Sequence, residues 1–126
     1  MKNSYLENLL NAIEGGENVK HGALSVAQCY YTSKEKGFGV MAWNEIMWDS
    51  DVEDVVSTLK DAGVNELYIT NQASNMLDVY LMMDDIGLKL RGIVRLENPD
   101  HKREVERWGK AFSPEFIPAM KLSFEE

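Results

Sequence analysis

The sequence predicts a small α/β domain, and three observations lead to this expectation. The chain has 126 residues, which suits one domain that buries roughly two-thirds of its unfolded surface. Two helical patterns, one with an apolar stripe at 51–62 and one apolar nearly all round at 75–86, each end at a glycine. A β-rich or alternating run follows each of these glycines, which is typical of strands. We therefore expect a single domain over residues 1–126, with a helical part at 1–37 and an α/β core at 38–126.

Two helices are expected in the N-terminal part. The stretch NSYLENLLNAIEGG places its leucines and isoleucine at helical spacing, with Asn3 or Ser4 as the cap and two glycines as the stop. In GALSVAQCYYTSKEKG one face is apolar, two lysines fall in the last turn, and Gly37 follows. These patterns predict a helical pair that packs beside the core.

The α/β core begins with FGVMAWNEIMW, for which we expect a short extended or irregular conformation packed on the core. The next four residues, SDVE, have the form of a capping box. In that motif Ser50 accepts a hydrogen bond from the amide of Glu53, and the Glu53 side chain reaches back. The stripe of valines and a leucine that follows predicts the helix 51–62.

A small mixed sheet of three strands is expected, at 66–70, 89–97 and 117–124. The first two strands are joined through helix 75–86 in a β-α-β crossover, which we expect to be parallel and right-handed. The last strand would return antiparallel after a long charged loop at 97–116, which exceeds a normal hairpin loop and has room for a helical turn.

Three motifs in this core carry a resemblance to a family. The first is W-D-S-D-V-E-D-V-V followed by A-G-V, from Trp48 to Val64. The second is a strand ending in T-N-x-x-S before a helix, then I-G and a strand with an internal glycine, from Thr70 to Val94. The third is the closing I-P-A-M-K-L. Over residues 38–124 the chain thereby resembles a family of small uncharacterised α/β domains of Gram-positive bacteria and their conjugative elements. The resemblance implies the α/β fold and no particular activity.

The cellular compartment is suggested by what the sequence lacks. No apolar run approaches the ~18 residues that cross a bilayer, so we expect no membrane segment. The stretch MKNSYLENLL has no apolar signal-peptide region. The only cysteine, Cys29, has no partner for an internal disulfide. We therefore expect a cytoplasmic protein.

The formal net charge of −8 is concentrated in the middle of the chain. Residues 49–85 contain one lysine against nine acids, whereas residues 86–126 contain eight basic and seven acidic residues. An acidic field favours basic partners and repels nucleic acid, although it is also what an ordinary acidic surface produces. Acids interleave with the basic residues of the last third, so direct nucleic-acid binding is not expected. Those basic residues could instead complement the acidic region, within one chain or between two copies.

The turn Thr70–Asn75 is the clearest candidate for a ligand site. It follows a strand and opens a helix, where unpaired N–H groups and the helix dipole attract anions in open α/β sheets. The side chains that could bind a phosphate or carboxylate are those of Thr70, Asn71, Ser74 and Asn75. The turn holds no glycine-rich cradle and no Lys or Arg, and a helix cap made by Ser74 or Asn71 explains the same residues. We prefer the cap and keep a small-anion site as the alternative.

No pattern in the sequence points to catalysis or to a metal. His21 and His101 are far apart and have no partners at ligand spacing. The acids at 49–54 lack the glycine-turned calcium-loop pattern. No catalytic base stands at a recognisable spacing from Cys29. We expect no cofactor and no metal, and we do not expect an enzyme.

The leading functional hypothesis is a domain that binds a protein partner through an acidic helix face. The expected surface comprises two tryptophans and four acids: Trp43, Trp48, Asp49, Asp51, Glu53 and Asp54. Helix 75–86 is apolar nearly all round, so either neighbouring helices cover it or a partner or second copy does. A narrower alternative is an acidic mimic of nucleic acid that inhibits a nucleic-acid-processing enzyme.

Overall fold

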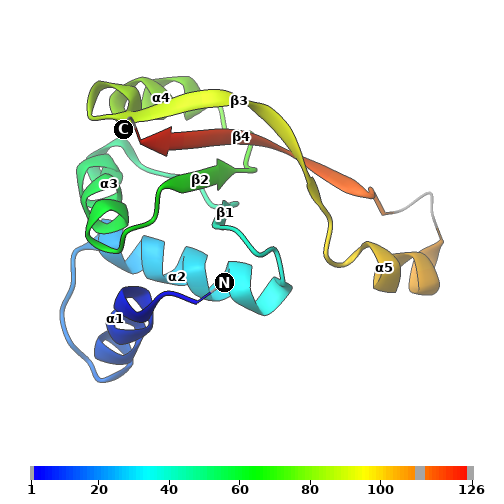
Figure 1. The fold of residues 1–126 in the computed structure, drawn as a ribbon, viewed down its shortest axis with the longest axis horizontal. Coiled ribbons are helices and arrows are strands. Elements are labelled where there is room, and N and C mark those ends of the chain that lie inside the picture. Colours follow the sequence, from blue (N-terminus) through cyan, green and yellow to red (C-terminus); the bar gives the residue numbers. More distant parts are fainter. Residues whose placement is uncertain (1, 110–112, 125–126) are drawn as a thin grey trace.

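The computed structural model describes residues 2–109 and 113–124, in which five α-helices accompany a four-stranded mixed sheet (Figure 1). The N-terminal elements are α1 (Ser4–Glu14), α2 (His21–Lys36), β1 (Ala42–Trp43) and a 3-10 turn, η1 (Asp49–Asp51). Next come α3 (Val52–Asp61), β2 (Glu66–Ile69) and α4 (Met76–Asp85). The chain closes with β3 (Leu88–Glu97), α5 (His101–Trp108) and β4 (Phe116–Phe124). The α/β class and the expected elements are confirmed.

The expected number of strands is wrong, because the sheet has the order β1-β2-β4-β3. The additional strand, β1, has two residues and pairs parallel to β2, with Ala42 opposite Tyr68 and Trp43 opposite Ile69. Its sequence could not reveal it, since two residues inside a continuous apolar segment show no alternation.

The two strands flanking α4 point the same way, but they are not neighbours. Both β2 and β3 pair antiparallel with β4, which lies between them. The β-α-β unit whose strands pair directly is therefore β1-α3-β2, one step earlier in the chain than expected. The right hand expected for the later crossover stays a prediction.

The helix ends agree only in part with their sequence signals. Asn3 caps α1, because its Oδ1 accepts a hydrogen bond from the Leu6 amide at 3.0 Å. Gly37 ends α2 in the left-handed conformation, with φ at 80°. The capping box is wrong: Ser50 lies inside η1, Asp51 takes the cap position, and no side-chain hydrogen bond caps α3. The preceding 3-10 turn tightens the chain at this end and displaces Ser50 from the cap position.

The hydrophobic core lies on one face of the sheet. Leu67 of β2 and Leu122 of β4 face each other in register and are both fully buried. Residues of α3 and α4, such as Leu59 and Met83, close this core and are also fully buried. The opposite face is polar, where the Tyr68 hydroxyl donates to Glu66 at 2.6 Å.

Helix α2 covers the edge of β1, where the buried Ser33 side chain binds both backbone groups of Ala42. The Ser33 hydroxyl accepts a hydrogen bond from the Ala42 amide at 2.9 Å and donates to the Ala42 carbonyl at 3.4 Å. Both groups belong to an edge strand, and Ser33 is fully buried. The hydroxyl therefore replaces the missing strand neighbour.

Replacing Ser33 by alanine should lower the free energy of unfolding by about 1–2 kcal/mol, because it leaves a buried amide without a partner. Urea unfolding followed by circular dichroism measures this loss. Thr32→Ala is the matched control, since Thr32 is exposed on the same helix. Equal stability of the two variants would contradict the role given to Ser33.

The strands β3 and β4 continue beyond the rest of the sheet as an arm, defined here as the described residues 94–109 and 113–119. Strand β2 pairs with β4 only from Met120 onward, so Val94–Glu97 and Phe116–Ala119 pair only with each other. Helix α5 sits at the tip, far from α3 and α4 in Figure 1. The expected charged loop at 97–116 therefore contains a complete helix, α5.

Candidate functional site

The segments that follow β1 and β2 are joined by side-chain hydrogen bonds. Since the two strands are parallel, their carboxyl ends lie at the same edge of the sheet. Thr70 Oγ1 donates to the Trp43 carbonyl at 3.2 Å, and Asn71 Nδ2 donates to the Glu45 carbonyl at 2.6 Å. Asn75 Nδ2 donates to the Met47 carbonyl at 2.9 Å. The turn thus fixes the path of the connection between β1 and α3.

The predicted cap of α4 by Ser74 or Asn71 is wrong. Asn75 occupies the cap position, and no side-chain hydrogen bond is made there. Asn71 Oδ1 instead accepts from the Ala73 amide at 3.1 Å and closes a local turn. The side-chain N–H groups of Asn71 and Asn75 donate to the carbonyls of Glu45 and Met47 and are not free to cap the helix. Ser74 is exposed, and an anion site at this turn stays a prediction.

Exposed apolar side chains stand on both of the segments that these hydrogen bonds join. Ile46 and Trp48 are 52% and 57% exposed, although Met47 between them is buried. The Asn75–Met47 bond brings them next to the start of α4, and α4 also contacts η1. Leu77 and Leu81, one turn apart on α4, are 76% and 58% exposed.

Exposed acidic side chains stand on the same elements. Asp49 and Glu53 are exposed at η1 and the start of α3, and Asp78 is exposed in the first turn of α4. We call these exposed apolar residues and acids together the Trp48 surface: Ile46, Trp48, Asp49, Glu53, Leu77, Asp78 and Leu81. Such a surface is complementary to an apolar side chain that has positively charged residues beside it.

Two of the predicted surface acids have structural partners. Asp51 Oδ2 lies 2.7 Å from His21 Nδ1, and Asp54 Oδ1 lies 3.4 Å from Lys20 Nζ. Both partners come from the start of α2. These pairs link α2 to α3, so Asp51 and Asp54 lie toward α2 rather than on the Trp48 surface.

Trp43 does not lie on the expected surface either. It pairs in register with Ile69 on the core face and is 2% exposed. Its indole N–H is buried and has no hydrogen-bond partner among the described residues. Sequence reasoning grouped Trp43 with Trp48 because both stand in one apolar segment, but β1 turns the first of them inward.

The exposed side of α4 was the alternative that the sequence left open. Neighbouring elements bury Met76, Val79 and Met83, whereas Leu77 and Leu81 stay exposed. The excess of apolar residues around this helix was the signal that could have located half of the apolar residues in the Trp48 surface. Ile46 carried no comparable signal.

The remaining chemistry-bearing residues are dispersed. His21 pairs with Asp51, and His101 lies 3.3 Å from the Ser113 hydroxyl on the arm. Within residues 2–109 and 113–124, no three His, Cys, Asp or Glu side chains are placed to hold a metal ion. None of the helices in this part of the chain has both the length and the apolar character needed to cross a membrane.

Cys29 should react slowly with alkylating reagents in the folded protein. Burial raises the pKa of its thiol to about 12, and its Sγ donates to the Ala42 carbonyl at 3.5 Å. The reactive thiolate is therefore scarce at pH 8. Iodoacetamide labelling followed by mass spectrometry should be slow in buffer and fast in urea. Equal rates in the two conditions would show that the thiol is accessible and ordinary.

Comparisons with known proteins place the chain in a family. No curated protein matched the chain, and no solved structure did. The family model described as "Domain of unknown function (DUF7698)" matches residues 25–124. The match reaches from α2 to β4 and so extends further toward the N-terminus than the motifs that first suggested a family. Occurrence in Gram-positive bacteria and conjugative elements stays a prediction. Because the match spans most of its length, this chain belongs to the family of domains of unknown function called DUF7698.

Proposed function

We propose that this domain binds a protein partner through the Trp48 surface. The observation that carries the proposal is that four exposed apolar side chains, with exposed acids close to them in the sequence, stand on two segments joined by the Asn75–Met47 hydrogen bond. Single exposed hydrophobic residues are ordinary on protein surfaces, but a group of them marks interaction sites. Tryptophan is also among the residues most enriched where binding energy concentrates.

The surface chemistry defines the kind of partner. An apolar centre calls for an apolar or aromatic side chain, and the acidic border calls for Lys or Arg around it. A purely electrostatic mimic of nucleic acid would not need Ile46, Trp48 and the leucines, so a protein contact explains more of the surface. We place this interaction in the cytoplasm, where the single thiol would stay reduced.

A comparative capture experiment tests this function. Immobilised wild-type chain and its Trp48→Ala/Leu77→Ala variant are exposed to one cell lysate, and captured proteins are identified by mass spectrometry. Tyr31→Ala is the control, because Tyr31 is 54% exposed on α2. We expect partners that are retained by wild type and the control, lost by the double variant, and released faster at high salt.

One outcome of this capture experiment would rule out the Trp48 surface. If wild type and the double variant capture the same proteins in the same amounts, the Trp48 surface is not the binding site. Thermal melting of all three chains verifies that they are folded. We expect all three to be folded, because substitutions of exposed side chains usually change stability little.

A further inference from the structure

The arm contributes very little to the hydrophobic core. Among the described residues between Leu90 and Met120, the one buried apolar side chain is that of Ala119 at the base of the arm, and it lies outside the main core cluster. A two-stranded ribbon without such packing is marginally stable in water. The arm nevertheless exposes aromatic residues, with Trp108 at 55% and Phe116 at 43% exposed. Both features are typical of an element that is covered by a partner.

The tip of the arm has a polar inner side and a basic outer side. On the inner side Glu104 accepts from Asn98 Nδ2 and from the Ser113 hydroxyl, each at 3.3 Å. The exposed residues of α5 are Lys102, Arg103, Glu106, Arg107 and Trp108. Three are basic and one is acidic, although Arg103 also pairs with Asp100 at 2.6 Å.

An aromatic group with positive charge beside it stands at the end of α5. The Arg107 guanidinium lies 5.1 Å from the centre of the Trp108 ring. The pair therefore presents an aromatic face and a cation together. The Trp48 surface combines apolar side chains with acids, so an aromatic ring beside a cation is complementary to it.

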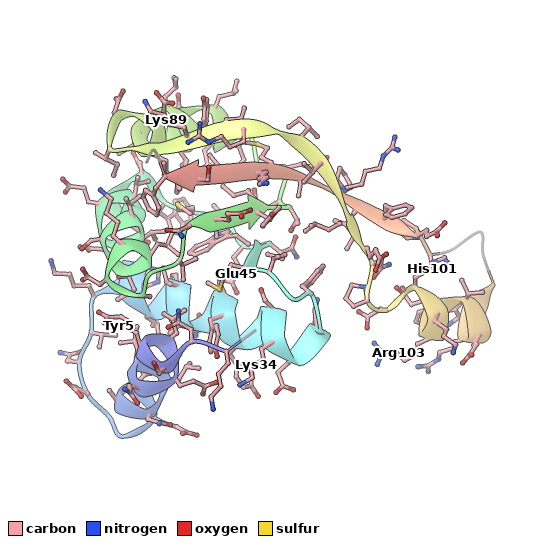
Figure 2. The ribbon with its side chains drawn as sticks, viewed as in Figure 1. Tyr5, Lys34, Glu45, Lys89, His101 and Arg103 are labelled. Atoms are coloured by element: carbon pink, nitrogen blue, oxygen red, sulfur yellow. The ribbon has the colours of Figure 1, made fainter. Side chains whose placement is uncertain are left out.

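The two surfaces cannot meet within one chain as it is folded. Figure 1 places α5 at the far end of the arm, whereas α3 and α4 lie at the opposite end of the sheet. Figure 2 shows His101 and Arg103 on α5, remote from Glu45 beside β1. A contact between these complementary surfaces therefore requires two copies.

We infer that the chain forms a homodimer in which the arm tip of each copy docks on the Trp48 surface of the other. The inference rests on the proposed function and names its partner as a second copy of this chain. Two identical contacts would close the pair by two-fold symmetry. Docking would also cover the arm's exposed tryptophan.

Sedimentation equilibrium on the full chain tests the homodimer. Wild type should dimerise with rising concentration, whereas Arg103→Glu/Arg107→Glu should raise the dissociation constant at least about tenfold. The surface variant Asp49→Lys/Glu53→Lys should do the same. Combining both pairs of changes in one chain should restore the dimer, because the charges are then exchanged across the contact. Lys2→Glu/Lys36→Glu, which changes exposed lysines elsewhere, should leave dimerisation unchanged.

Several results would overturn the inference. The homodimer is ruled out if the wild-type chain stays monomeric up to about 1 mM. A dimer whose dissociation constant is unchanged by the arm variant or by the surface variant would also overturn it. So would a combined variant that does not regain dimerisation. If the chain is monomeric but Trp48→Ala/Leu77→Ala still abolishes capture of another protein, the proposed function stands and only the homodimer fails. Loss of duplex DNA binding in Arg103→Glu/Arg107→Glu without any dimer would assign the arm to nucleic acid instead.

Discussion

Replacing Gly22 by alanine should destabilise the protein by about 2–3 kcal/mol, although the same change in a helix usually stabilises. A Cβ atom at this position would lie 2.6 Å from Asp54 Cβ and 2.9 Å from the Asp51 carbonyl oxygen. It would also lie 3.0 Å from the Val55 amide nitrogen. Because two of these three atoms belong to the backbone of the α3 region, no side-chain rotation relieves the overlap.

Chemical denaturation of wild type and Gly22→Ala measures this effect, with Gly15→Ala as the matched control. A Cβ at Gly15 would meet its nearest atom, the Asn11 carbonyl oxygen, at 3.4 Å, and the backbone there has an ordinary φ of −75°. The control should change stability by no more than about 0.5 kcal/mol. A stabilised Gly22→Ala would show that α2 and α3 do not approach as closely as described.

Local patterns predicted the elements well because each helix and long strand carries its own periodicity. Helices 51–62 and 75–86 were placed within a residue or two of α3 and α4, and Asn3 was among the caps expected for α1. The close approach of α2 to α3 gave no such signal. A glycine in the first turn of a helix has the same sequence whether or not another backbone lies against it.

The candidate site was predictable only in part, because contacts between distant segments leave no signal in the local sequence. The turn 70–75 was recognised as polar and placed at the right end of its strand, but its donors reach carbonyls at 43–47. That pairing depends on β1, a strand too short to show in the sequence. The position of Trp43 depends on it too, because the register with Ile69 turns this side chain into the core. Non-local contacts of this kind decide which residues are exposed.

Leu67→Ala should lower the free energy of unfolding by about 2–5 kcal/mol, the largest single effect we expect. Leu67 is fully buried at the centre of the sheet, where it faces Leu122 in register. Its truncation removes apolar contacts and leaves a cavity that the surrounding strands cannot close. Since a small domain has only about 5–15 kcal/mol of stability, part of the variant population should be unfolded at 37 °C.

Leu77→Ala makes the same chemical change on the Trp48 surface and serves as the control. Leu77 is 76% exposed, so its truncation should change stability by no more than about 0.5 kcal/mol. Urea midpoints at an unchanged slope measure both variants. A large loss in Leu77→Ala would mean that this leucine packs within its own chain, and the case for a binding surface would lose its main support. Equal, small losses in both variants would instead contradict the core described for β2.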